Sequence, residues 1–283
     1  MGSMNETGSY RQRVNEAKEH IKKLFEIEKV MYVTEIKVRL DGSADEKVRL
    51  WQWITQNALN ELHNAGDLRR RTRVGAFQVE GEKTRRTEMS FYFPSKYCYA
   101  DVAPVIRTKM DIINRHSAVA SKAGSYAEQV VEKALAKTGF KVPSRDGKST
   151  RRFRKKEWKG QHDLDFIAHG KLENRWYGIQ VKNTLAYPEW DDVAGLVDVC
   201  DYLGLTPWFI SRQLPGDYTW DLYRSGGFYT LFDKWLLPKR EKELCKAVNT
   251  LLGIPVMCKD TRGAVSFLGS KLGLVHAYKP YVG

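Results

Sequence analysis

Two short apolar segments separated by a polar gap constrain the fold of this chain more than any other feature. They are residues 163–168 (DLDFIA) and residues 177–182 (YGIQVK). Both patterns are typical of strands whose apolar residues mark the buried face. Because side chains alternate along a strand, Gln180 and Lys182 project to the same side, two positions apart. We therefore expect the carboxylate of Asp165, an amide oxygen and an ammonium group to converge where these strands end.

The second half of the chain alternates between helical and extended patterns. A helix is predicted from about Tyr126 to Gly139, followed by strands over 140–143, 162–168 and 176–182. A helix over 191–203, a strand over 207–211, a hairpin-like segment over 220–231 and a closing helix over 239–252 complete the series. This order predicts an α/β fold in which a mixed sheet is flanked by helices.

The first half combines helices with two β-prone segments. Helices are predicted over 11–28, 34–40 and 45–64, and extended segments over 68–79 and 87–93. Three helices and a two-stranded wing resemble a winged helix-turn-helix domain, although a small α/β domain whose helices serve only packing remains an alternative. With 283 residues the chain has room for two domains. The predicted division is a winged-helix domain over 5–96, a connecting helix over 97–122 and a second domain over 123–283.

Polar and basic residues of the first half are candidates for contacts to DNA. The third predicted helix carries Thr55 and a set of amides able to reach base edges, whereas Trp51 and Trp53 are expected to be packing residues. The arginines of the wing suit phosphate or minor-groove contact. The amides are Gln52, Gln56, Asn57 and Asn60, and the arginines are Arg69, Arg70, Arg71 and Arg73.

Charge is concentrated in two windows of the sequence. Lysine and arginine number 47 against 34 acidic residues, a net charge of +13 that favours polyanionic partners. Residues 69–86 carry a balance of +5 and residues 145–159 a balance of +6. The second window is expected to be a solvated loop that contacts backbone phosphates, with Phe153 available for stacking or wedging. Its candidate phosphate ligands are Arg151, Arg152, Arg154, Lys155 and Lys156.

Several classes of protein are disfavoured. The longest apolar runs fall short of a membrane span, and the polar start lacks the apolar core of a signal peptide, so we expect a soluble protein without a membrane partner. The four cysteines are far apart and show no C-x-x-C spacing. Neither a structural zinc site nor a disulfide framework is indicated, which fits a reducing cytoplasm.

The convergent groups suit the hydrolysis of a phosphodiester. That reaction needs an activated water and neutralisation of the charge that develops on phosphorus, and Mg²⁺ or Mn²⁺ held by oxygen ligands supplies both. Asp165 is the best anchor ligand because it directly precedes an apolar strand, and Asp163 is its competitor. Gln180 offers an amide oxygen, and Lys182 can orient the water and stabilise charge.

The order of these motifs resembles the PD-(D/E)xK nuclease superfamily. It comprises Glu128 on a helix, then residues 139–142, 165–168 and 180–182, and it spans about 122–232. The nearest branches are the archaeal Holliday junction resolvases and the Mrr-like restriction endonucleases. The resemblance implies a restriction-endonuclease-like fold in which Glu128, Asp165 and Gln180 hold metal and Lys182 assists the water. Gln180 departs from the usual acidic residue, which leaves room for a weakened site.

Together these patterns predict a Mg²⁺-dependent DNA endonuclease that acts as a homodimer, by analogy with nucleases that cut both strands. A non-catalytic DNA-binding regulator with a degenerate nuclease domain is the main alternative, and an RNA-processing nuclease is a third. A surface role for Glu128 is as compatible with the pattern as a catalytic one. Asp191 and Asp192 are expected to stabilise the start of the following helix through its dipole.

Overall fold

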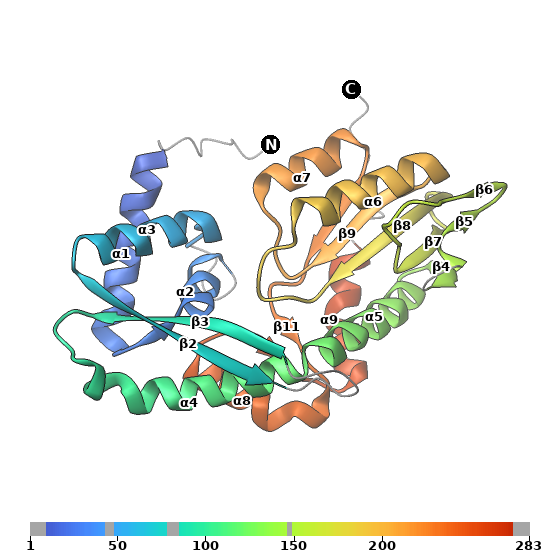
Figure 1. The fold of residues 1–283 in the computed structure, drawn as a ribbon. Coiled ribbons are helices and arrows are strands. Elements are labelled where there is room, and N and C mark those ends of the chain that lie inside the picture. The colour runs from blue at the N-terminus through green and yellow to red at the C-terminus, as the bar shows by residue number, and fades with distance from the viewer. Residues whose placement is uncertain (1–9, 43–47, 78–84, 146–148, 274–283) are drawn as a thin grey trace. The chain divides into compact units, whose positions relative to one another are not determined.

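The computed structural model describes residues 10–42, 48–77, 85–145 and 149–273 (Figure 1). Contacts divide the chain into two units, residues 1–119 with 243–255 and residues 120–242 with 256–283. Residues 97–119 and residues 243–255 both belong to the first unit in this division. The sequence pattern suggested instead a separate connecting helix over 97–122 and an uninterrupted second domain over 123–283. No helix within the described ranges is long and apolar enough to cross a membrane.

The first unit joins helices to a three-stranded antiparallel sheet. The sheet has the order β1-β3-β2, and its long β2–β3 hairpin pairs Leu68 with Pro94 at one end. The helices α1, α2 and α3 pack around a shared core, to which β3 contributes Tyr92. The elements are α1 (Tyr10–Ile27), β1 (Met31–Tyr32), α2 (Val33–Leu40), α3 (Gln52–Asn64), β2 (Leu68–Phe77), β3 (Arg85–Pro94), α4 (Tyr99–Ala118) and α8 (Lys242–Leu251).

Helical spacing of apolar residues explains the packing of α1. Val14, Ala17, Ile21 and Phe25 recur three or four residues apart and are all buried. Because residues at this spacing share one face of a helix, they form the stripe that α1 presents to α3. The predicted helix over 11–28 is therefore confirmed, whereas the third helix begins at Gln52, and residues 43–47 lie outside the described part.

The second unit is built on a five-stranded mixed sheet of order β10-β9-β8-β7-β4. Strand β7 is antiparallel to both of its neighbours, β4 and β8, and β8, β9 and β10 run parallel. The sheet and its main helices are α5 (Ala120–Lys137), β4 (Phe140–Arg145), β7 (Phe166–Gly170), β8 (Arg175–Lys182), α6 (Trp190–Leu203), β9 (Thr206–Ser211), α7 (Gly216–Arg224), β10 (Phe228–Leu231) and α9 (Thr261–Leu272). Smaller elements are β5 (Arg152–Phe153), β6 (Lys156–Glu157), β11 (Trp235–Leu236), η2 (Lys239–Glu241) and β12 (Val256–Met257).

Helices cover both faces of this sheet. On one face Phe166, Ile179 and Trp208 form a core with residues of α5 and α9, and on the other Ile167 and Phe209 form a core with residues of α6. Figure 1 shows α5 and α9 on one side of the strands and α6 and α7 on the other. Strands buried on both faces account for the near-continuous apolar runs in the sequence. The prediction of a mixed sheet flanked by helices is confirmed.

Three predictions for the second half of the chain are wrong. The helix expected from Tyr126 starts at Ala120, because Ala123 and Ala127 pack into the core and the intervening Gly124 is tolerated within the helix. The hairpin expected over 220–231 is α7 followed by β10, with Gly226 at a φ of +70° between them. The chain also continues past the expected closing helix over 239–252 into β12 and α9, and that helix divides into η2 and α8.

Candidate functional site

Asp165 lies in a bend directly before β7, beside the end of β8. Phe166 pairs with Ile179 as the last pair of the antiparallel register. The Asp165 N–H donates to the Ile179 carbonyl at 2.9 Å, and the Val181 N–H donates to the Asp165 carboxylate at 2.6 Å. The carboxylate thus takes the place of the next backbone acceptor in the ladder. The Asp165 carboxylate is thereby held against the backbone of Val181, the residue between Gln180 and Lys182.

Lys182 lies on the same side of β8 as Gln180 and is paired to the next helix. Its Nζ is 2.7 Å from a carboxylate oxygen of Asp192, in the first turn of α6. The two side chains are 29% and 27% exposed, so the pair is half-buried. Asp192 was expected mainly to stabilise the helix start, with a metal role as the less favoured alternative. The structure adds a direct contact with Lys182, which places a second carboxylate beside the candidate site.

The end of β8 is tied to the beginning of α5. The Asn183 side-chain amide, which is buried, donates to the Ala123 carbonyl and to the Leu236 carbonyl, each at 2.9 Å. Glu128 is half-buried five residues after Ala123, about 7 Å further along the helix axis. The start of α5, the helix that carries Glu128, therefore lies beside the end of β8, which carries Lys182.

Asp163 is drawn away from this group by the basic segment. Its carboxylate pairs with the Arg151 guanidinium, which also donates to the Gly160 carbonyl at 2.8 Å. Asp163 precedes the strand, which begins at Phe166 and not at the predicted residue 162. This pairing favours Asp165 over Asp163 as the anchor carboxylate.

The oxygen donors at this site suit a hard divalent cation. Asp165 supplies a carboxylate and Gln180 an amide oxygen, and Val181 adds a backbone carbonyl. Mg²⁺ is commonly held by one or two carboxylates and keeps several water ligands. Among the described residues no group of three or more histidine, cysteine, aspartate or glutamate side chains is arranged to hold a metal. By its chemistry, a set of one carboxylate and neutral oxygens fits a cation bound through few protein ligands and completed by water and phosphate.

The basic segment forms a small hairpin rather than the expected solvated loop. Strands β5 and β6 pair antiparallel, and Arg154 and Lys155 make the exposed turn between them. Phe153 is buried against Trp176, with ring centroids 4.9 Å apart, so the prediction that it stacks on or wedges into a substrate is wrong. Its apolar ring is needed to anchor the hairpin to the α6 face of the sheet.

Two other cations of the hairpin have partners on the protein surface. Arg152 pairs with Glu157 at 2.9 Å, and Lys156 donates to the Tyr202 carbonyl at 2.7 Å. Both side chains remain exposed. These contacts fix the direction of the hairpin and still allow phosphate contact from its outer side. Residues 146–148 of the basic window lie outside the described part of the chain.

The predicted base-reading amides of α3 occupy three different environments. Gln52 donates to the Asp41 carboxylate at 3.2 Å. Gln56 donates to Asn60 at 3.1 Å on the exposed side of the helix, and Asn57 donates to the Tyr10 hydroxyl at 3.0 Å. Thr55, which was grouped with these residues, is fully buried and cannot reach a ligand. The exposed polar side of α3 is therefore formed around Gln56 and Asn60.

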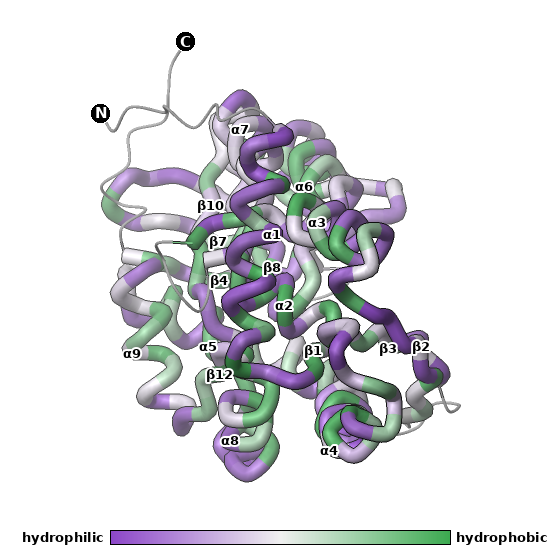
Figure 2. Tube along the Cα trace, turned by 90° about the vertical axis from the view of Figure 1, so that its left-hand side faces the viewer, coloured by the Kyte–Doolittle hydropathy of each residue, from purple (hydrophilic) through white to green (hydrophobic). Residues whose placement is uncertain are grey.

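The arginines of β2 line an edge strand. Arg69, Arg70 and Arg71 are exposed and Arg73 is half-buried, and Figure 2 shows this part of the hairpin as strongly hydrophilic. The guanidinium groups of Arg71 and Arg73 lie 5.1 and 4.9 Å from the Tyr99 ring centroid. Stacking on an aromatic ring orders an arginine without neutralising it. These cations keep their charge available to a polyanion.

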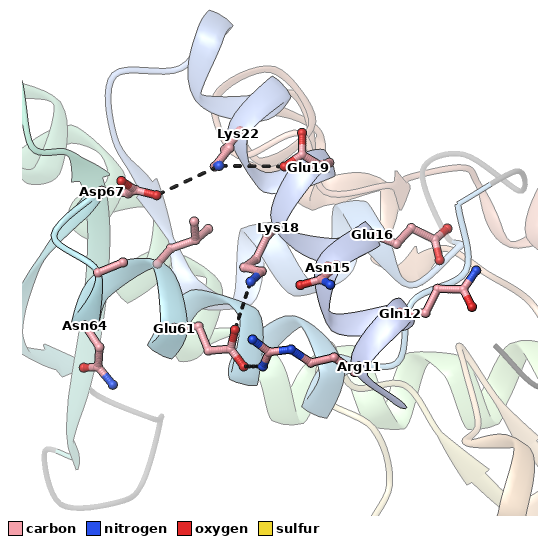
Figure 3. A pocket seen from close by; sticks show the side chains of 12 residues that line it. Arg11, Gln12, Asn15, Glu16, Lys18, Glu19, Lys22, Glu61, Asn64 and Asp67 are labelled. Carbon is pink, nitrogen blue, oxygen red and sulfur yellow. Dashed lines mark hydrogen bonds and ion pairs between the residues drawn. The ribbon is translucent and has the colours of Figure 1, made fainter. Parts of the chain in front are cut away.

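A groove between α1 and the end of α3 carries balanced charge (Figure 3). Arg11 and Lys18 approach Glu61 at 2.6 and 3.0 Å, and Lys22 lies 3.7 Å from Glu19 and 4.0 Å from Asp67. Because the opposite charges in the groove pair with one another, it offers no excess charge to a ligand. We do not assign it a function.

No family model matches the chain, and comparison with curated proteins and with solved structures finds no significant match. The assignment of a function consequently rests on the residues and geometry of the two units. Two features escaped the sequence patterns: the pairing of Asp192 with Lys182, and the exposure of Trp51 and Trp53, which were expected to be packing residues. The one sequence signal for the pairing was the position of Asp192 near the start of a predicted helix; no signal indicated the exposure of the two tryptophans.

Proposed function

We propose that this protein is a metal-dependent DNA endonuclease that hydrolyses phosphodiester bonds at the adjoining ends of β7 and β8. One observation carries the proposal. The Asp165 carboxylate accepts the N–H of Val181, and the two residues flanking Val181, Gln180 and Lys182, lie on one side of β8. A carboxylate, an amide oxygen and an ammonium group at one strand end are the groups that such a hydrolysis requires.

Each residue has a distinct role in this proposal. A bound Mg²⁺ or Mn²⁺ would activate water and neutralise charge on the phosphate. Asp165 would anchor the cation, and the Val181 N–H holds its carboxylate in one orientation. Gln180 would add a neutral ligand. Glu128 lies on α5, which covers the face of the sheet opposite to Lys182 and Asp192, so it would have to reach the cation around the strand end. Lys182, positioned by Asp192, would orient the attacking water and stabilise the developing negative charge.

The order of elements supports a relationship to the PD-(D/E)xK superfamily. The helix carrying Glu128, three antiparallel strands, the helix α6 and the strand β9 follow in the order on which the resemblance rests. In the first unit the series from α1 to β3, with two long strands after three helices, supports the proposal of a winged-helix targeting domain. The net charge of +13 suits a DNA partner in the cytoplasm, and a homodimer would place two such sites on a duplex.

Cleavage assays test this proposal directly. Plasmid, linear duplex and four-way-junction DNA would be incubated with Mg²⁺ or Mn²⁺, and with a chelator as a blank. Asp165→Asn removes the charge but keeps an acceptor for the Val181 N–H, so the strand end should fold normally. Lys182→Ala removes the ammonium group. Both variants should lose cleavage by roughly 10²–10³-fold or more, in the range seen when one charge-stabilising group is removed.

Lys171→Ala is the matched control, because Lys171 is an exposed lysine after the opposite end of β7. It should cleave like the parent. Undiminished cleavage by both Asp165→Asn and Lys182→Ala would show that the reaction occurs elsewhere.

Gln180 supports a second candidate function. It is a neutral residue where most of the superfamily has an acid, although Mrr-like members commonly have glutamine there, and no metal-holding group of three or more histidine, cysteine or acidic side chains is found among the described residues. A DNA-binding protein that has lost catalysis would bind DNA and cleave none of the three substrates with either metal. That result would favour the regulator over the nuclease.

A further inference from the structure

Three aromatic rings form an exposed cluster at the start of α3 in the first unit. Tyr10 stacks on Trp53 with ring centroids 5.6 Å apart and an interplanar angle of 6°, and Trp51 lies 5.6 Å from Trp53. Their exposed fractions are 52% for Tyr10, 45% for Trp53 and 37% for Trp51. Large aromatic side chains normally contribute buried area, so three exposed rings in contact mark a surface that is available to a ligand. We call Tyr10, Trp51 and Trp53 the aromatic platform.

The platform is held rigidly by neighbouring contacts. Asn57 donates to the Tyr10 hydroxyl at 3.0 Å and fixes that ring against α3. The Trp51 carbonyl accepts the Thr55 N–H at 3.0 Å and so belongs to the first turn of the helix. Rigid rings bind a flat ligand with little loss of conformational freedom. The cluster is therefore ordered before a ligand arrives.

Three arginines lie near the platform residues along the chain. Arg11 follows Tyr10 on α1, and Arg13 donates to the Arg49 carbonyl at 2.9 Å, two residues before Trp51. Arg11 and Arg13 are paired with Glu61 and Glu16, whereas the exposed Arg49 has no ion-pair partner in the described part of the chain. Aromatic rings beside basic groups suit a ligand that is both flat and anionic. The polar side of α3, with Gln56 and Asn60, continues beyond the platform.

We infer that the aromatic platform stacks an unpaired base of single-stranded DNA. A base inside a duplex is already stacked on both sides, so only an unpaired base can offer its face to a protein ring. Neighbouring arginine supplies the attraction to the phosphate of the same nucleotide. This inference rests on the proposed DNA partner and narrows the substrate to DNA with a single-stranded or unstacked segment, such as a branch or an overhang.

Binding measurements with Trp53→Ala test this assignment. Fluorescence anisotropy would be recorded with a labelled single-stranded oligodeoxynucleotide, with the blunt duplex of the same sequence and with the corresponding RNA strand. We expect the Kd for the single strand to rise by roughly 5- to 150-fold, as for the loss of one base-stacking ring. We attribute duplex binding to the β2 arginines, so the Kd for the duplex should change by less than about twofold. Tighter parent binding to the RNA strand than to the DNA strand would overturn the choice of DNA.

Two variants serve as controls. Trp53→Phe keeps a ring at the same place and should retain most of the affinity for the single strand. Trp220→Ala removes an equally exposed tryptophan from α7 of the second unit and should bind like the parent. Thermal unfolding of each variant should match the parent, because the platform is exposed.

Unchanged single-strand affinity in Trp53→Ala would overturn the inference, as would an equal loss for single strand and duplex. Neither result touches the proposed nuclease, which is tested separately by Asp165→Asn and Lys182→Ala in the second unit. Conversely, if Trp53→Ala loses single-strand affinity and the parent cleaves no DNA, the base-stacking inference stands and the proposed nuclease activity is rejected.

Discussion

Each unit contains a lysine paired with an acidic side chain, and the two pairs differ in burial and in how many hydrogen-bond partners the lysine has. In the first unit Lys109 lies 2.9 Å from both carboxylate oxygens of Glu35 and 2.9 Å from the Val30 carbonyl, and both side chains are buried. In the second unit Lys182 meets Asp192 at 2.7 Å at a half-exposed sheet end. An ammonium group has three protons to donate, and Lys109 gives them all to protein acceptors. The interior group serves structure, and the half-exposed group remains able to engage a ligand.

Lys109→Met gives the largest expected effect. The substitution leaves Glu35 as a buried carboxylate without its main cation, and breaking a buried pair in this way costs about 3–5 kcal/mol. Chemical denaturation of the full chain would measure the loss in the free energy of unfolding. Arg152→Met, which removes an exposed pair with Glu157, is the matched control and should change stability little.

Adding Glu35→Gln to Lys109→Met should restore much of the stability, because the remaining buried group is then neutral. DNA cleavage per folded molecule should stay unchanged throughout this series. A stability loss for Lys109→Met no larger than that for Arg152→Met would show that the buried pair does not stabilise the unit.

The same group predicts how stability depends on pH. Burial raises the pKa of Glu35 from 4.5 to about 7, although Lys109 opposes the shift. The unfolded chain therefore releases this proton first, so the contribution of Glu35 to stability falls as pH rises from 4.5 to 7 and is constant above that. Without Lys109 the pKa rises further and the fall continues above pH 7. The deficit of Lys109→Met against the parent should thus be smallest in mild acid; a deficit that shrinks with rising pH would contradict this account.

Asp192→Asn tests whether the half-exposed pair serves function. The pair is partly screened by solvent, so its loss should change the free energy of unfolding by about 1 kcal/mol or less. Cleavage should fall by roughly tenfold, because misplacement of an assisting group by about 1 Å can cost up to about 10²-fold. Asp198→Asn, on an exposed side of the same helix, is the control. A stability loss with unchanged cleavage would place Asp192 with the structural charges.

Gln180→Glu adds a charge to the candidate site, whereas Asp192→Asn removes one. It adds a carboxylate on the residue next to Val181, whose N–H holds Asp165, and Mg²⁺ affinity rises with the number of charged oxygen ligands. Titration of the metal should show half-maximal cleavage at a severalfold lower Mg²⁺ concentration than in the parent. Gln213→Glu, outside the strand, should leave the titration unchanged. If Gln180→Glu behaves like Gln213→Glu, Gln180 is not a metal ligand.

Sequence patterns predicted the elements of the second unit better than their ends. Alternation and apolar runs placed strands at β7, β8 and β9, because burial on both faces leaves a strong signal. The extension of α5 back to Ala120 was missed, since Gly124-Ser125 weakens local propensity while the core contacts of Ala123 and Ala127 override it. Tertiary packing decides such boundaries and is not visible in a single sequence.

The candidate site was predicted as a set of residue types rather than as a set of contacts. The order of Asp165, Gln180 and Lys182 along two strands was readable because strand geometry fixes it. The contact between Lys182 and Asp192 was not, because it depends on how α6 returns over the sheet. For the same reason Phe153, which is followed by basic residues in the sequence, was expected at the surface and is buried.

The arginines of β2 are exposed charges of a third kind, ordered by a ring and not by an acid, and they give the smallest expected effect. Arg71→Ala should weaken duplex binding similarly for all sequences and reduce the slope of log Kd against log salt by about 1, as for one lost phosphate contact.

Tyr99→Phe removes the hydroxyl contacted by Arg73 but keeps the ring beneath both arginines, so the slope should stay near that of the parent. Tyr99→Leu removes the ring as well and frees both guanidinium groups without changing their charge. It should therefore lower affinity while leaving the slope close to the parent value, because counterion release depends on the charges brought to the phosphates, whereas ordering of the side chains affects affinity alone. An unchanged slope in Arg71→Ala would show that this edge of the sheet does not contact DNA.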